Sequence, residues 1–100
     1  MNFKFHPAAA QEYSDAAHYY DGQAEGLGDR FVAEIEKGIS RICRAPLSWG
    51  ILSRNTRRCL ANHFPYGIIY VVDDGRIFIL AVMHLKRKPG YWETRLRDIK

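Results

Sequence analysis

The residues best suited to chemistry lie together near the C-terminus of this 100-residue chain. Three consecutive cations, Lys86, Arg87 and Lys88, cannot all be buried, so we expect them to form an exposed basic edge. Tyr91 and Trp92 follow a Pro-Gly pair, and their flat rings suit stacking on nucleic-acid bases or anchoring a protein. Trp92 has an equally good second interpretation, in which its ring packs the C-terminal segment onto the core.

His84 precedes this basic run and is a candidate for acid–base chemistry, because a neutral imidazole accepts a proton near neutral pH. Combined with an arginine that stabilises a pentavalent phosphate and a tyrosine that transfers a proton, it would support RNA cleavage by attack of the ribose 2′-hydroxyl. That chemistry requires His84, Tyr91 and either Arg58 or Arg87 to converge. The alternative, which we favour, is a histidine that is simply hydrogen-bonded at the end of a strand.

Arg57 and Arg58 form a second basic site, in a stretch whose polarity alternates loosely like that of a strand. Neighbouring residues of a strand point to opposite faces of the sheet. Only one of the two arginines is therefore expected to face solvent fully.

Motifs for metals, cofactors and covalent catalysis are absent from the sequence. There is no Cys-x-x-Cys pair, no phosphate-binding glycine loop and no nucleophile-elbow serine. The four histidines are scattered without the spacing of metal ligands. Cys43 and Cys59 stand in apolar stretches, where we expect buried, reduced thiols. The sequence therefore predicts no metal and no cofactor.

Charge is unevenly distributed along the chain. Residues 1–50 hold five Lys/Arg and seven Asp/Glu, a net charge of −2, whereas residues 51–100 hold ten and four, a net charge of +6. This asymmetry favours an anionic partner, either nucleic acid or an acidic protein segment, with a solvated basic face as the alternative. Hydrophobic residues make up 47%, enough for one core, so a single domain over residues 1–100 is expected. No apolar run suits a membrane span and no signal peptide is recognisable, which predicts a cytoplasmic protein.

The first half of the chain predicts one strand and two helices. Phe3 and Phe5 alternate with polar residues, which indicates a short strand with one buried face. Apolar residues then recur at helical spacing over residues 8–21, and Gly22 is expected to stop this helix. A second helix is predicted over residues 26–44, antiparallel to the first. Its apolar stripe consists of Leu27, Phe31, Ile35, Ile39 and Ile42.

The second half predicts a three-stranded meander. Strands are expected over residues 54–61, 66–72 and 76–85, with a hairpin turn at residues 73–75 and one or two helical turns over residues 91–99. The order β-α-α-β-β-β is an α+β fold, in which a helical hairpin packs on a mainly antiparallel sheet and a short C-terminal tail follows. The last two strands are apolar on both faces, so the second face of the sheet needs a loop, the tail or a partner to cover it.

Two segments of the second half resemble the RelE/ParE toxin superfamily, on the ParE-like side that includes plasmid-stabilisation toxins. They are residues 64–70 (FPYGIIY) and residues 79–92 (ILAVMHLKRKPGYW). The resemblance implies a RelE/ParE-like fold and a toxin of a type II toxin–antitoxin system, which a cognate antitoxin neutralises in a hetero-oligomer. ParE-like members poison DNA gyrase and are not enzymes, whereas RelE-like members are endoribonucleases that cleave mRNA on the ribosome.

The stretch before Arg57 carries Ser53, Arg54 and Asn55 rather than a lysine cluster, which favours gyrase as the target over the ribosome and mRNA. If the chain were instead RelE-like, the resemblance would assign catalysis to Arg58, His84, Arg87 and Tyr91. From charge and aromatic character, the residues expected to bind a target or partner are Arg57, Lys86, Arg87, Lys88, Tyr91 and Trp92. A third alternative is a non-toxic module that retains only its antitoxin contact.

Overall fold

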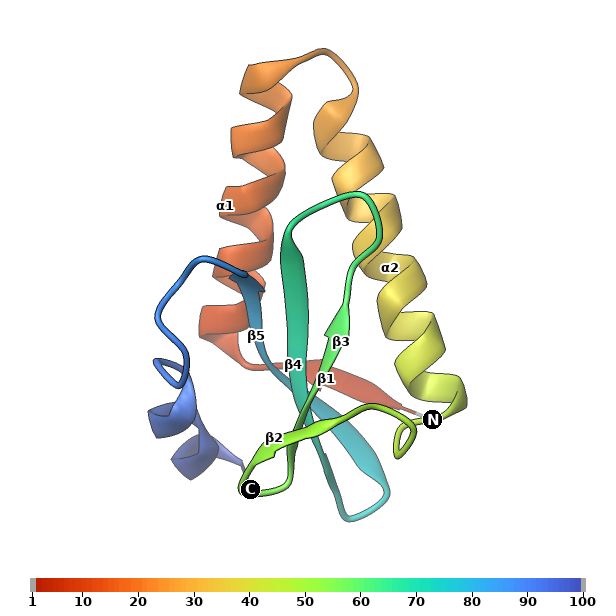
Figure 1. Ribbon diagram of the computed structural model, residues 1–100, viewed down its shortest axis with the longest axis vertical. Coiled ribbons are helices and arrows are strands. Elements are labelled where there is room, and N and C mark those ends of the chain that lie inside the picture. Colours follow the sequence, from red (N-terminus) through yellow and green to blue (C-terminus); the bar gives the residue numbers. More distant parts are fainter. Residues whose placement is uncertain (1, 100) are drawn as a thin grey trace.

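A five-stranded sheet forms the centre of the structure, and two long helices cover one of its faces (Figure 1). The computed structural model describes residues 2–99. The elements in chain order are β1 (Phe3–Phe5), α1 (Pro7–Gln23), α2 (Leu27–Arg44), β2 (Ile51–Ser53), β3 (Thr56–Leu60), β4 (Tyr66–Asp73), β5 (Arg76–His84) and a 3-10 helix (Glu93–Asp98). The strand order is β1-β5-β4-β3-β2; β1 runs parallel to β5, and all other neighbours are antiparallel. The predicted α+β fold is confirmed.

The two helices form the expected antiparallel hairpin, but α1 is longer than predicted. His6 caps its start, because the imidazole Nδ1 accepts a hydrogen bond from the Ala8 N–H at 3.0 Å. The prediction that Gly22 stops this helix was wrong: α1 continues to Gln23, and the position of Gly22 is open to solvent. The chain reverses later, at Gly26, whose φ of +77° is a left-handed conformation that glycine adopts without strain.

The apolar stripe of α2 packs on the sheet as its spacing predicts. Four of its five residues are buried, namely Phe31, Ile35, Ile39 and Ile42. Gly38 lies on the same side of the helix, and a Cβ atom there would come within 2.7 Å of the Cδ1 atom of Ile68. This glycine therefore allows α2 to approach β4 closely.

The strand predicted over residues 54–61 is shorter than expected, because residues 54 and 55 form a turn and β3 begins at Thr56. β2 and β3 are joined by a tight turn at Arg54 and Asn55, whose φ angles are +49° and +68°. Two consecutive residues in this left-handed conformation make a two-residue hairpin, and asparagine tolerates it well. The sheet therefore gains an edge strand, β2, directly after the loop that follows α2. The other predicted turn, at residues 73–75, is confirmed between β4 and β5.

The pairing of β4 with β5 contains an irregularity that the sequence did not indicate. Ile69 pairs with Ala81, but the next residue, Tyr70, pairs with Ile79, so Leu80 is an extra residue in β5. Such a β-bulge redirects side chains and disrupts the regular hydrogen bonding of the strand. It explains why Leu80 and Ala81, although consecutive, belong to the same buried cluster.

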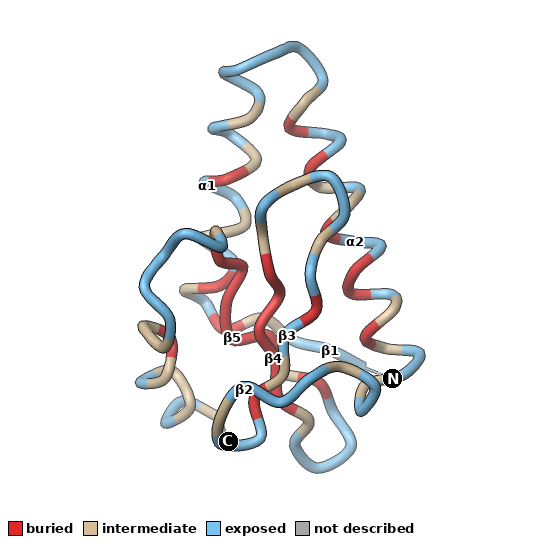
Figure 2. The backbone as a smooth tube through the Cα atoms, viewed as in Figure 1, coloured by how far each residue is buried: buried red, intermediate tan, exposed pale blue. Residues whose placement is uncertain are grey.

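Figure 2 shows that much of β4 and β5 is buried, and the buried apolar residues form two clusters, one on each face of the sheet. The face under the helices, called the helix face below, carries Cys59, Ile68, Tyr70, Ile77, Ile79 and Val82. The opposite face, called the tail face, carries Ile69, Val71, Leu80, Ala81 and Met83. It is covered by residues 91–99, called the tail, through the side chains of Tyr91, Trp92, Leu96 and Ile99. Of the three covers expected for the second face, the tail is therefore the one present.

The prediction that β1 has one buried face is confirmed only in part. Phe5 is half-buried and stacks on Tyr13 with ring centroids 5.7 Å apart, but Phe3 is 47% exposed because β1 lies at the edge of the sheet. Of the two cysteines, Cys59 is buried, and burial raises the pKa of its thiol, whereas Cys43 is half-buried. Within residues 2–99, none of the helices is long and apolar enough to cross a membrane.

Candidate functional site

The chain leaves the sheet at His84 and enters a turn that carries the three consecutive cations. A hydrogen bond from the Arg87 N–H to the His84 carbonyl, at 3.0 Å, shapes this turn. Lys86, Arg87 and Lys88 are all exposed, as their sequence predicts, and together they are called the basic turn below. In Figure 1 the basic turn lies in the blue loop that links β5 to the tail.

Glu12 of α1 is the centre of a hydrogen-bond network beside the basic turn. Its Oε1 accepts hydrogen bonds from the Val82 N–H at 3.1 Å and from Nη1 of Arg95 at 3.0 Å. Its Oε2 accepts from Nη2 of Arg95 at 2.9 Å and from the Tyr91 hydroxyl at 2.7 Å. Arg87 reaches the same oxygen at 3.4 Å. One carboxylate therefore connects α1, β5, the basic turn and the tail.

The network also completes the backbone hydrogen bonding of β5. β1 pairs with β5 only as far as Ile79, so the outer edge of β5 has no neighbouring strand beyond that residue. At the bulge, the Val82 N–H donates to Glu12, and the Leu80 carbonyl accepts from Arg95 at 2.8 Å. Unpaired backbone groups that are shielded from water cost free energy, so these two side chains stabilise the uncovered end of the strand.

Tyr91 is the first residue of the tail, and its ring contacts Arg87 of the basic turn. The guanidinium of Arg87 stacks over its ring at 3.7 Å, and that of Arg95 lies 5.1 Å from the ring centroid. Burial, and then the hydrogen bond to Glu12, raise the pKa of Tyr91 well above its ordinary value. The phenol therefore stays protonated, and its proton is directed at Glu12 rather than at an open site.

His84 lies on the helix-face side of β5. Its cross-strand neighbour is Tyr66, and the two rings meet edge-on with centroids 5.2 Å apart. Its Nδ1 accepts a hydrogen bond from the Lys86 N–H at 3.1 Å, which confirms the histidine hydrogen-bonded at a strand end that we favoured from the sequence. His84 and Arg87 line one hollow of about 250 Å³, together with residues of α1 and Tyr66.

Arg57 and Arg58 point to opposite faces of the sheet, as expected. Arg57 is half-buried, and its Nη1 donates to the carbonyls of Leu47 and Trp49 at 3.1 and 2.6 Å, so it fixes the loop that precedes β2. Arg58 is exposed and pairs across the strands with Ile69, which belongs to the tail face. Arg57 therefore has a structural role in the loop, whereas Arg58 is available to a partner.

The four residues of the endoribonuclease hypothesis do not form one site. Arg87 contacts the ring of Tyr91 and shares a hollow with His84. Arg58 projects from the tail face, on the other side of the sheet from His84. Of the two arginines proposed for the cationic role, only Arg87 is therefore a neighbour of the histidine.

Trp92 is only 3% exposed and packs on the tail face. Of its two interpretations, the core role is the one observed, and the expectation of an exposed ring for binding was wrong. Its indole Nε1 is buried, with no hydrogen-bond partner among the described residues. A buried unpaired donor costs free energy. The site of Trp92 therefore suits the carbon atoms of the ring but provides no hydrogen-bond acceptor for its N–H group.

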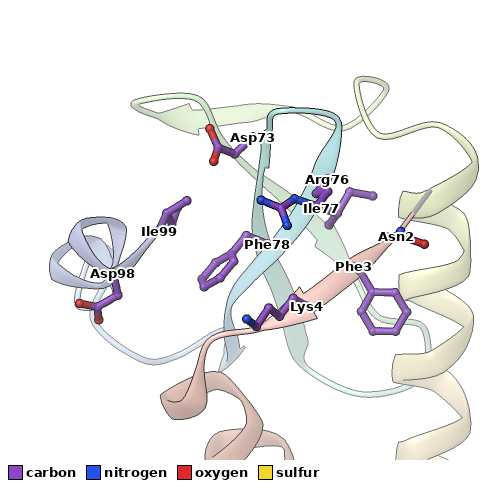
Figure 3. Close-up of a pocket in the computed structure, with 9 residues that line it drawn as sticks. All are labelled: Asn2, Phe3, Lys4, Asp73, Arg76, Ile77, Phe78, Asp98 and Ile99. Carbon is purple, nitrogen blue, oxygen red and sulfur yellow. The ribbon is translucent and has the colours of Figure 1, made fainter.

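A further hollow, of about 590 Å³, opens at the far end of the tail (Figure 3). It lies between β1, the start of β5 and the end of the tail, and its charged residues are Lys4, Asp73, Arg76 and Asp98. None of the residues predicted to catalyse or bind lines it. Two cations and two anions give this hollow no net charge preference for a ligand.

Glu12 and Arg95 were not among the residues predicted from the sequence. Glu12 did carry a signal, since it occupies the same side of α1 as Ala9 and Ala16, both of which are buried. A carboxylate on an apolar stripe needs a partner. Arg95 carried no such signal, because its partner lies 83 residues away in the chain.

Residues 3–89 match the family model for the ParE toxin of the type II toxin–antitoxin system, parDE. A search of curated protein sequences finds no match. Among solved structures, a chain of the chromosomal ParDE toxin–antitoxin system from P. aeruginosa has a TM-score of 0.73 at 16% identity, and the match covers 86% of this chain and 97% of that one.

Two further solved structures share the fold. A chain of the YoeB–YefM complex from Staphylococcus aureus has a TM-score of 0.56 at 24% identity, and the match covers 82% of this chain and 93% of that one. The isolated E. coli RelE toxin has a TM-score of 0.62 at 14% identity, and the match covers 98% of both chains. Identities this low show the fold alone, whereas the family model covers most of the sequence. The chain therefore belongs to the ParE toxins of type II toxin–antitoxin systems.

Proposed function

We propose that this toxin stops growth by binding and poisoning DNA gyrase, and that it does not cleave RNA. The observation that carries the proposal is the separation of Arg58 from His84 on opposite faces of the sheet. Cleavage by a ribose 2′-hydroxyl needs a base, an acid and a cation around a single phosphate. With Arg58 on the other face, Arg87 would have to supply the cation and Tyr91 the acid, but both are already engaged by Glu12, so this arrangement is better suited to binding than to that reaction.

The state of Tyr91 supports the same conclusion. A general acid works best when its pKa lies near the operating pH. Burial and the hydrogen bond to Glu12 move the pKa of Tyr91 in the opposite direction, further above neutrality. Its hydroxyl proton is already donated to a carboxylate at 2.7 Å.

The basic turn is the part of the toxin that we assign to the target. Its three cations project from the end of β5, and Lys86 and Lys88 form no ion pair within residues 2–99. Unpaired cations on an exposed turn attract an anionic surface and accelerate its association. Gyrase bound to DNA is a partner of that kind.

We assign the antitoxin contact to the tail-face surface around Arg58. Three large apolar side chains are exposed there, namely Leu52, Leu60 and Leu85. Two of them, Leu52 and Leu60, line a hollow of about 360 Å³ together with Arg58 and Trp49. Exposed apolar residues around a cation suit a partner segment that alternates apolar and acidic side chains, as an acidic antitoxin would provide.

The test uses two purified systems in parallel. In the first, gyrase, plasmid DNA and ATP are mixed with the toxin, and we expect loss of supercoiling with accumulation of protein-linked, cleaved DNA. In the second, translating ribosomes receive the same toxin, and we expect no codon-positioned cuts in the message. Cuts in the message without any effect on gyrase would overturn the proposal.

A matched pair of charge reversals locates the surface. The double variant Lys86→Glu with Lys88→Glu should abolish gyrase inhibition, because it changes two unpaired cations of the basic turn. The control is the double variant Arg30→Glu with Lys37→Glu, which makes the same change of net charge at two exposed residues of α2. Equal inhibition by the wild type and the double variant would exclude the basic turn as the target site.

One observation favours the endoribonuclease as the second candidate. His84 and Arg87 share a hollow, and Tyr91 lies against Arg87, so three of the four groups are neighbours. His84→Asn separates the two candidates, because the amide oxygen can still accept the hydrogen bond from the Lys86 N–H but cannot act as a base near neutral pH. A gyrase-directed toxin should remain toxic with this change, whereas an endoribonuclease that uses His84 as its base should lose toxicity and message cleavage together.

A further inference from the structure

We propose that Glu12 is a positioning residue, which holds Arg87 of the basic turn in the orientation that the target binds. The inference rests on the proposed function of the basic turn and deepens it. The three cations of that turn differ in their contacts. Lys86 and Lys88 form no ion pair within residues 2–99, whereas Arg87 is held from two sides.

Arg87 is held by the carboxylate of Glu12 on one side and by the ring of Tyr91 on the other. Nη1 of Arg87 lies 3.4 Å from Oε2 of Glu12, and the guanidinium carbon lies 3.7 Å above the ring of Tyr91. The Arg87 side chain is still 53% exposed, so other N–H groups remain open to a partner. A planar guanidinium that is already oriented loses less conformational freedom when it binds a phosphate or carboxylate.

Glu12 can orient Arg87 because Glu12 itself is held by the scaffold. Its side chain is only 14% exposed, and it accepts hydrogen bonds from the backbone of Val82 and from both terminal nitrogens of Arg95. The hydroxyl of Tyr91 donates to the same carboxylate. Both surfaces that contact Arg87 are therefore anchored to α1 and β5 rather than to the exposed loop.

Electrostatics and positioning predict opposite effects of Glu12→Gln on the affinity of the toxin for its target. Glu12→Gln makes the face around the basic turn more positive, so charge alone predicts tighter binding of an anionic partner. Positioning predicts weaker binding, because Arg87 loses its charged anchor and Tyr91 loses its strongest acceptor. Glu25→Gln is the matched control: it makes the same change of charge at an exposed residue of the helix-hairpin tip.

The experiment measures binding of the full-length toxin to gyrase on a DNA duplex at several salt concentrations. We expect Glu12→Gln to weaken binding on the order of tenfold, with Glu25→Gln unchanged or slightly tighter. Equal or tighter binding by Glu12→Gln would overturn the inference. All measurements are made well below the melting temperature of each variant, so that a loss of stability alone does not change the result.

A second variant covers the case in which Glu12→Gln does not fold. The double change Glu12→Gln with Arg95→Gln removes both members of the buried ion pair, so neither charge is left uncompensated. Arg87 still lacks its anchor in this variant, and binding should remain weak. Recovery of wild-type binding together with wild-type stability would show that Glu12 serves only to neutralise Arg95.

A target-independent measurement separates this inference from the proposed function. Relaxation of the Arg87 Nε–H group by ¹⁵N NMR reports the order of the guanidinium in the free toxin. We expect an ordered group in the wild type and in Glu25→Gln, and a mobile group in Glu12→Gln. If the wild type fails to bind gyrase, the proposed target is wrong; if Arg87 is equally ordered without the Glu12 charge, the positioning role is wrong.

Discussion

The helix face and the tail face of the same sheet are covered by different means. Helices of 17 and 18 residues cover the helix face, and the buried cluster there is almost entirely apolar. The tail face is covered by a short 3-10 helix that has no buried residue, together with Trp92 and the Glu12 network. Stability is therefore concentrated on the helix face, whereas the tail face has a lighter cover, which Glu12 of α1 fixes at the edge of β5 through Arg95 and Tyr91.

The difference has a physical cause in chain length and hydrogen bonding. Long helices satisfy their own backbone groups and can use whole apolar stripes for packing. A segment as short as the tail cannot do so, and it relies on a few side-chain hydrogen bonds that hold it at defined points. Such a cover is easier to adjust, and it brings polar groups to the place where a partner binds.

The largest expected effect is on the helix face. Phe31→Ala removes a fully buried ring between the helices and the sheet and should lower the free energy of unfolding by about 3–5 kcal/mol. Domains of this size have a total of only about 5–15 kcal/mol, so the variant should be near its unfolding transition in water. Urea titration followed by circular dichroism measures the change. Leu96→Ala, in the tail, should cost much less, and an equal loss for both would contradict the proposed division of stability.

At alkaline pH, the ionisation of buried tyrosines should lower the stability of the folded protein, and the effect can be compared between the two faces. Burial raises the pKa of Tyr70 on the helix face to about 12, against an ordinary value of 10.0. In the unfolded chain this tyrosine ionises near pH 10, whereas in the folded protein it remains neutral. Its contribution to stability is therefore complete below about pH 10 and is lost as the pH rises toward about 12, at roughly 1.4 kcal/mol per pH unit.

Urea titrations across that pH range, with Tyr70→Phe as the variant, measure this contribution. The variant should lose stability less steeply between about pH 10 and 12 than the wild type does. Tyr91→Phe is the comparison on the tail face, since burial and Glu12 also raise the pKa of Tyr91. Identical pH profiles for the wild type and Tyr70→Phe would contradict the effect of burial on this residue.

A smaller change in the free energy of unfolding is expected for Trp92→Phe. Trp92→Phe removes an indole N–H that has no partner among the described residues, which offsets part of the apolar area lost with the larger ring. We expect a change within about 1 kcal/mol, whereas Trp92→Ala should release the tail. Hydrogen exchange of the amides in residues 93–98 measures the release, with the amides of β4 as an internal control. If exchange in β4 accelerated to the same extent, the two covers would not be independent.

The smallest effect is expected for the exposed leucines of the tail face. Leu60 and Leu85 are 46% and 41% exposed, so Leu60→Ser and Leu85→Ser should change the free energy of unfolding by no more than about 0.5 kcal/mol. Their effect should appear instead in antitoxin binding, which isothermal calorimetry with the partner protein measures. A large loss of stability would show that these side chains belong to the core and not to a binding surface.

Elements with a strong local signal were predicted well. The stripe of α2 and the turn at residues 73–75 follow from spacing and turn chemistry alone. β2 was missed, since a strand of three residues has no periodicity of its own and exists only because it pairs with β3. The bulge at Leu80 was missed for a similar reason, because it is a property of the pairing between β4 and β5.

The sequence by itself determined the fold class, the helix stripe and the exposure of the basic turn, because periodicity and the cost of burying charge act over a few neighbouring residues. Only the tertiary structure decided that Trp92 is buried and that Glu12 gathers Tyr91 and Arg95 from the far end of the chain. Those contacts join residues separated by 79 and 83 positions. They depend on strand register and on the path of the tail, which no local pattern in the chain specifies.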